Sequence, residues 1–284
     1  MSDFQPVYAA AITPRGPKGD LNFGAMFELI DYLCAARTPG IMLFDGAGEY
    51  PAYAAEERSR VTRLAVKRSR APVLVGVGSP ALDISVMLAR EARDAGAAGV
   101  VVPPPLFFNG DSADLMEFYR QFAAETAPGV PAVITSFSQS IKLVEDGLFA
   151  GMLDCSEDFQ LAGLPPSRIL TGNDEMLRRA LSAGAGAISP AACALPELTA
   201  ALARAISASD APQIERLASA LSEFLAWSRQ FPSPVAVKVA ASVRGVKTGP
   251  LLAPLAPEKC ALLERFREWF RSWLPAMKAI TAHG

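Results

Sequence analysis

Eight short apolar runs alternate with segments of helical periodicity through residue 207, and this alternation limits the folds open to the chain. The runs are apolar throughout, as expected of strands that are buried on both faces of a parallel sheet. Eight such strands alternating with helices predict a closed parallel (β/α)₈ barrel, and an open doubly wound sheet is the alternative. The predicted strands are 7–13, 40–44, 72–77, 99–102, 131–136, 149–153, 168–172 and 186–189.

Helices are predicted between these strands and beyond the last of them. Those of the barrel are 23–36, 55–69, 82–95, 112–126, 143–148, 175–183 and 195–207, and three more follow at 211–229, 234–244 and 257–274. We therefore predict a barrel over residues 1–208 and a helical extension over residues 209–284 that packs on it as one structural unit. The aromatic residues of the extension need cover from the barrel flank or from a second subunit; they are Trp227, Phe231, Phe266, Trp269, Phe270 and Trp273.

Composition excludes several classes of function. The chain has 284 residues, of which 27 are basic and 29 acidic, and no basic block, so we expect no nucleic-acid partner. We find no apolar run of membrane-spanning length and no secretory signal, and therefore expect no membrane contact.

The cysteines Cys34, Cys155, Cys193 and Cys260 are widely spaced, which indicates reduced, mostly buried thiols in a cytoplasmic protein. The one histidine, His283, is next to last, which argues against catalysis that needs a rigid imidazole.

Acidic residues follow three of the predicted strands. After the second strand, Asp45 and Glu49 lie where a barrel opens onto an active site, although Asp45 would also cap the loop and Glu49 the helix that begins near Ala54. Asp154, Asp174 and Glu175 occupy similar positions. Asp174 and Glu175 suit helix capping and ligand binding equally well. Converging carboxylates could bind Mg²⁺, but we predict neither a metal nor a cofactor.

The order and spacing of several short motifs resemble one known family across nearly the whole chain, that of dihydrodipicolinate synthase and N-acetylneuraminate lyase. The motifs are Ala11-Ile12-Thr13-Pro14, Asp45-Gly46-Ala47-Gly48-Glu49, Glu56-Glu57-Arg58, residues 72–78, Ala95-Gly96-Ala97, Gly172-Asn173-Asp174, residues 184–189 and Lys238. The resemblance implies a barrel with a C-terminal helical segment. It also implies a carbon–carbon lyase that acts on pyruvate, or on a related oxo acid, through a lysine Schiff base.

The departures from the family pattern fall in one site. Leu153 stands at the position of the Schiff-base lysine, and leucine has no nucleophile, so imine formation there is impossible. The other family positions are changed as well. The proton-relaying tyrosine falls on Thr135, and the two carboxylate-binding threonines fall on Gly46 and Ala47. The tyrosine that subunits exchange falls near Phe107, and the carboxylate-binding arginine falls on Ser140.

No other residue replaces the missing lysine. We interpret Lys142 as a solvated loop residue and Lys238 as a helix residue whose stem lies along the barrel wall. Cys155 has no histidine base and is expected to be buried. Asp174-Glu175 resembles the acid pair with which sugar-acid lyases of the family bind substrate hydroxyls.

These arguments predict a homo-oligomeric family member, a dimer or tetramer, without Schiff-base aldolase activity, that binds a small oxo acid or a polyol. The alternatives are a metal-assisted lyase or hydratase and a non-catalytic regulatory or structural subunit. No catalytic residue is assigned. The predicted binding residues are Gly46, Ala47, Thr135, Leu153, Gly172, Asp174, Glu175, Ile188 and Ser189.

Overall fold

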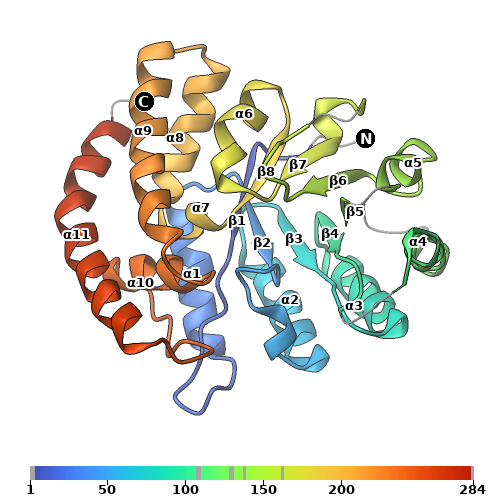
Figure 1. Ribbon diagram of the computed structural model, residues 1–284. Helices are drawn as coiled ribbons and strands as arrows, with labels where there is room; N and C mark the ends of the chain where they lie inside the picture. The colour runs from blue at the N-terminus through green and yellow to red at the C-terminus, as the bar shows by residue number, and fades with distance from the viewer. Residues whose placement is uncertain (1–3, 107–109, 128–130, 137–138, 161–162, 283–284) are drawn as a thin grey trace.

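The centre of the molecule is a closed barrel of parallel strands (Figure 1). The computed structural model describes residues 4–106, 110–127, 131–136, 139–160 and 163–282. Each strand pairs with the next, and β8 closes on β1, with Val7 opposite Ala187. The predicted barrel is thus confirmed, and the open doubly wound alternative is wrong. The strands are β1 Val7–Ala10, β2 Gly40–Leu43, β3 Val73–Gly76, β4 Gly99–Val102, β5 Ala132–Thr135, β6 Gly151–Asp154, β7 Ile169–Thr171 and β8 Gly186–Ser189.

Strand residues alternate between two apolar layers, because successive side chains point to opposite faces. In β2, Met42 belongs to the cluster that fills the barrel, whereas Ile41 and Leu43 belong to the cluster between strands and helices. In β6, Leu153 likewise belongs to the barrel interior. Both layers are apolar, which explains why the strands read as continuous apolar runs.

Helices surround the strands (Figure 1). Several ends follow local signals: Asp111 caps α4 with its side chain, and α3 ends at Gly96, which has a φ of 88°. The helices of the barrel are α1 Phe23–Ala35, α2 Ala55–Arg68, α3 Leu82–Ala95, α4 Ser112–Thr126, α5 Ser140–Glu145, α6 Leu177–Ser182, α7 Pro190–Ala194 and α8 Pro196–Ser207.

Within the barrel, the sequence-based boundaries are wrong at both ends of the helix between β5 and β6. The helix predicted at 143–148 is α5, which begins at Ser140 and ends before Gly147, a glycine with a φ of 76°. A left-handed glycine is a common stop for a helix, so Leu148 lies outside it. Strand β6 accordingly begins at Gly151 rather than at residue 149.

Three helices follow the barrel: α9 Ala211–Ser228, α10 Val235–Val243 and α11 Pro257–Thr281. Helix α9 packs on α8, and α10 packs on α7 and α11. In Figure 1, α11 (red) runs along the outside of this layer. The division into residues 1–208 and 209–284 stays a prediction. The described part of the chain contains no helix long and apolar enough to cross a membrane.

The aromatic residues of the extension pack against one another within the chain. The ring of Phe266 lies 6.2 Å from that of Phe224, 5.8 Å from Trp227 and 5.9 Å from Phe231, centroid to centroid. Phe266 and Phe270 are fully buried. Contacts within the extension itself therefore supply much of the burial for which we expected the barrel flank or a second subunit.

Helix α11 is longer than predicted. We expected it to end at Leu274, before Pro275, but it continues through the proline to Thr281. Tertiary contacts hold the last turns: Met277 is buried, and the Gln213 side chain donates to the Ile280 carbonyl at 2.8 Å. These contacts offset the backbone hydrogen bond that a proline removes from a helix.

Candidate functional site

A cavity of about 340 Å³ opens at the carboxyl ends of the strands, the end of such barrels where active sites are found. Its walls are mostly apolar, and Asp45 is the charged side chain among its described lining residues. They are Met42, Phe44, Asp45, Gly46, Ala47, Tyr50, Gly76, Val101, Pro103, Thr135, Leu153, Cys155, Gly172, Ile188, Pro190 and Ser233.

Leu153 and Thr135 lie side by side on the cavity wall. They are partners in the ladder between β6 and β5, so both side chains belong to the same face of the sheet. Leu153 is buried and Thr135 half-buried. The structure thus brings together the two positions that the resemblance gives to a lysine and a tyrosine, and it places an alkyl group and a short hydroxyl there.

The turn after β2 forms another wall. It is bracketed by two left-handed residues, Phe44 with a φ of 58° and Glu49 with a φ of 51°. This conformation is uncommon for residues other than glycine and often marks functional loops. Inside the turn, Asp45 Oδ1 accepts a hydrogen bond from the Gly48 amide at 2.8 Å, and the Ala47 amide also stabilises this carboxylate. The prediction that Asp45 caps its loop is confirmed.

The electrostatic environment of Asp45 is unusual for a surface carboxylate. Desolvation raises the pKa of Asp45 to about 6, and the negative charge of Asp174 adds to the increase, while the turn amides oppose it. The same charge of Asp45 contributes to a raised pKa of the Cys155 thiol. Asp45 therefore titrates close to neutral pH on the cavity wall.

Glu49 does not cap the helix near Ala54, and this expectation is wrong. The carboxylate of Glu57 accepts from the Ala54 amide instead, at 3.1 Å. Glu49 forms an ion pair with Lys238 of α10, and both side chains are buried, with exposures of 8% and 1%. The left-handed φ of Glu49 turns the chain where this pair forms. The pair ties the β2 turn to the C-terminal helices.

Acidic residues after β7 have structural partners. Ser189 donates to Asp174, and the Ala191 amide donates to the other Asp174 oxygen at 2.8 Å, so Asp174 caps the short helix after β8. Desolvation raises the pKa of Asp174 to about 6, and the bond from Ser189 partly offsets the increase. Glu175 is exposed and pairs with Arg229 at 3.0 Å. Both acids line a hollow of about 300 Å³ that adjoins the cavity and shares Gly172 with it.

The predicted binding residues therefore fall into three groups. Asp174 and Glu175 line the adjoining hollow. Ser189 is not among the described residues that line the cavity or the hollow, because its side chain points to the helix side of β8. Phe107 and His283, which are not among the predicted binding residues, lie outside the described residues. The remaining predicted residues line the cavity: Gly46, Ala47, Thr135, Leu153, Gly172 and Ile188.

Sequence reasoning missed other parts of the site. Tyr50 follows the β2 turn, and Ser233 belongs to the loop between α9 and α10, far along the chain. Behind the wall, the buried guanidinium of Arg58 donates to the carbonyls of Gly76 and Gly78, each at 2.8 Å, and lies over the Tyr50 ring. The spacing of Glu56-Glu57-Arg58 was the available signal for Arg58, whereas no local pattern indicates Ser233.

The structure also places two candidate substitutes for the lysine, Cys155 and Lys142, and the family arginine position, Ser140. Cys155 was expected to be buried, but it is exposed on the rim, with its Sγ directed at Gly172. Desolvation still raises the pKa of its thiol to about 11, so it is protonated at neutral pH and a poor nucleophile. Lys142 is an exposed residue of α5, as predicted, although it lies on a helix rather than in a loop. Ser140 is buried and contacts the Met152 sulfur at 3.1 Å.

The rim carboxylates do not form a metal centre. Across the described ranges of the chain, no group of three or more His, Cys, Asp or Glu side chains is placed to bind one ion. Asp154 accepts from the Ser156 amide at 2.9 Å, and the other rim acids have the partners given above. The residues present thus fit capping better than metal coordination.

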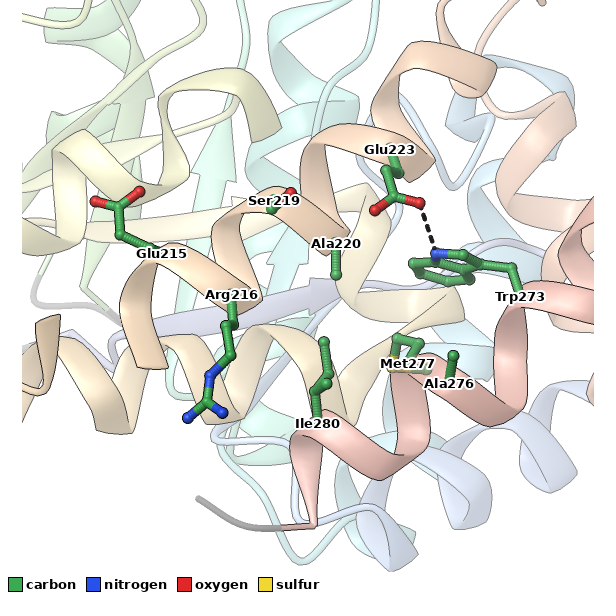
Figure 2. Close-up of a pocket in the computed structure, with 9 residues that line it drawn as sticks. All are labelled: Glu215, Arg216, Ser219, Ala220, Glu223, Trp273, Ala276, Met277 and Ile280. Atoms are coloured by element: carbon green, nitrogen blue, oxygen red, sulfur yellow. Dashed lines mark hydrogen bonds between the residues drawn. The ribbon is translucent and has the colours of Figure 1, made fainter. Parts of the chain in front are cut away.

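A larger hollow, of about 510 Å³, lies between α9 and α11, away from the strand ends. Figure 2 shows its residues on these two helices, with the Glu223 carboxylate accepting from the Trp273 indole, at 3.0 Å. Glu215, at its edge, is paired with Arg178. This hollow is a groove between packed helices, so we take the barrel mouth as the candidate site.

Comparison with known proteins places these features in a family. The model of the dihydrodipicolinate synthetase family matches residues 3–269. A DapA-like lyase of Halobacterium salinarum is 31% identical over 76% of each chain. The 4-hydroxy-tetrahydrodipicolinate synthase of Methanothrix thermoacetophila is 25% identical over 89% of this chain and 92% of its own. The crystal structure of dihydrodipicolinate synthase from Aquifex aeolicus aligns with a TM-score of 0.85 at 25% identity, covering 95% of this chain and 98% of that one.

Proposed function

Because the chain belongs to the dihydrodipicolinate synthetase family, we propose that it is a lyase-type barrel that binds a small ligand at its mouth but forms no Schiff base there. One observation carries this proposal: Leu153 occupies the cavity wall at the end of β6, next to Thr135. An imine needs a primary amine, and proton transfer to it needs an acid of suitable strength. Leucine and threonine supply neither.

The lysines nearest the barrel do not compensate. Lys142 is exposed on α5 and does not line the described cavity wall. Lys238 is buried in an ion pair with Glu49, so its amine contacts that carboxylate, and it is not among the described residues that line the cavity. Neither side chain is placed to attack a ligand in the mouth.

The remaining parts of the proposal come from the sequence and the resemblance. We propose a small oxo acid or a polyol as ligand, a cytoplasmic location and assembly into a homo-oligomer. A non-catalytic regulatory or structural subunit is the alternative, and co-purification of a stable partner would favour it.

The test is reductive trapping. The protein is incubated with pyruvate and borohydride, and its intact mass is measured. We expect no pyruvyl adduct on the wild-type protein. A stoichiometric adduct, mapped by peptide mass spectrometry to Lys142, Lys238 or another lysine, would overturn the proposal.

A further inference from the structure

The β2 turn presents backbone amides to the barrel mouth, and the chain already supplies an anion to them. The Gly48 amide donates to Asp45 Oδ1 at 2.8 Å, and the Ala47 amide stabilises the same carboxylate. Adjacent amides in a turn form a good site for one carboxylate or phosphate group. Here that group is the side chain of the turn's own first residue.

The walls around Asp45 offer a second anion no counter-charge. Among the described lining residues, none is lysine or arginine, and the polar side chains besides Asp45 are those of Tyr50, Thr135, Cys155 and Ser233. Arg229, in the adjoining hollow, is paired with Glu175. Arg58 lies behind the wall, where its two terminal nitrogens donate to the carbonyls of Gly76 and Gly78.

A ligand carboxylate in this cavity would therefore face two costs. It would lose water without a cation to replace the hydration, and it would approach the negative charge of Asp45 in a partly desolvated space. An uncharged ligand of the same shape faces neither cost. The space next to the turn is open, because a Cβ added at Gly46 would meet no atom within 4 Å.

We propose that Asp45 is a built-in carboxylate that occupies the turn amides, so that the cavity selects small uncharged ligands over carboxylates. The inference rests on the proposed function, which makes this cavity the ligand site. Of the two ligand classes proposed there, an oxo acid and a polyol, it favours the uncharged polyol. It assigns Asp45 as a specificity-determining residue.

The experiment compares pyruvate with pyruvamide, its uncharged isostere, by calorimetric titration of the full chain near pH 7.5. For the wild type we expect at least about tenfold tighter binding of pyruvamide, or no pyruvate binding at all. Asp45→Gly frees the turn amides and should raise the affinity for pyruvate at least about tenfold. Asp45→Asn removes the charge but keeps an oxygen for the amides, so it should raise pyruvate affinity by less than Asp45→Gly does. If Asp45→Gly does not fold, the comparison of Asp45→Asn with the wild type tests the inference.

Two outcomes would overturn the inference. One is a wild-type protein that binds pyruvate as tightly as pyruvamide, and the other is an unchanged pyruvate affinity in both folded Asp45 variants. Thermal unfolding checks the fold of each variant. These titrations contain no reductant, so the outcome is separate from the mass gain that would overturn the proposed absence of a Schiff base.

Discussion

At the scale of single residues, the chemistry of this barrel depends on what one side chain can offer at the end of β6. Leu153 is 7% exposed and lies on the cavity wall, so the position faces the mouth. An amine there would reach the ligand, whereas an isobutyl group contributes only packing. The neighbouring Thr135 hydroxyl is shorter and far less acidic than a phenol.

Leu153→Lys tests this account directly. The variant should lose some stability, because a group that needs solvation replaces an apolar one. The same desolvation should lower the pKa of the new amine and leave a usable neutral fraction near pH 7. Pyruvate should then be trapped by borohydride at residue 153, as measured by intact and peptide mass, and removal of Asp45 should make trapping faster.

Aldol turnover should not return with this single change, because Thr135 cannot relay a proton as a phenol does. The control is Leu153→Met, which has a flexible stem without an amine and should give no adduct. A well-folded Leu153→Lys protein without adduct would show that residue 153 does not reach the ligand. Measurable lyase turnover would show that another group already transfers the proton.

The buried ion pair of Glu49 and Lys238 gives a second prediction at this scale. Lys238→Met keeps the length of the side chain but leaves the Glu49 carboxylate buried without its partner. Breaking a buried pair in this way costs about 3–5 kcal/mol, so we expect a loss of that order in the free energy of unfolding, measured in urea.

Two matched variants control this measurement. The double variant Glu49→Gln, Lys238→Met removes both charges and should recover most of the loss. Lys247→Met breaks the exposed pair with Glu28, whose side chains are 68% and 54% exposed, and should change stability by at most about 1 kcal/mol. Equal effects of Lys238→Met and Lys247→Met would contradict the importance of the buried pair.

At the scale of elements, α11 shows how packing outweighs a local stop signal. Pro275 lies inside the helix and removes one backbone hydrogen bond, yet the helix continues for six more residues to Thr281. Contacts of Met277 and Ile280 with the rest of the chain hold those turns. The helix is therefore formed against the preference of one of its own residues.

Pro275→Ala should stabilise the protein for this reason. Alanine restores the amide and removes the clash of the ring with the preceding turn, and the gain should be about 1 kcal/mol or more, up to the roughly 3 kcal/mol that an interior proline costs. The measurement is urea unfolding at neutral pH. Pro257→Ala is the matched control: Pro257 is the first residue of the same helix, where proline costs no hydrogen bond, so we expect no gain. A loss of stability in Pro275→Ala would mean that the proline itself packs favourably.

At the scale of the whole molecule, the C-terminal helical extension contributes residues to the barrel mouth. Helix α10 supplies Lys238 to the β2 turn, and the loop before it supplies Ser233 to the cavity. The aromatic residues of α9 and α11 bury one another. Much of the aromatic surface for which we expected cover from the barrel flank or from a second subunit is thus covered by these two helices.

We still expect a dimer or tetramer, now on the ground of the resemblance alone, with two-fold interfaces. Light scattering at micromolar protein concentration measures the mass. A monomer of 30.0 kDa would contradict this prediction.

The sequence alone determined the barrel, the C-terminal helices and the family, because each depends on local periodicity or on the spacing of motifs, while the loss of the lysine stays a prediction. It also determined that Asp45 caps its loop, since a side chain that bonds to an amide three residues on is a local feature. Only the tertiary structure decided the partners of Glu49 and Asp174, which lie 189 and 15 residues away. Local propensity contains no information about such contacts, which exist because barrel closure brings strand ends together and the last helices fold back on them.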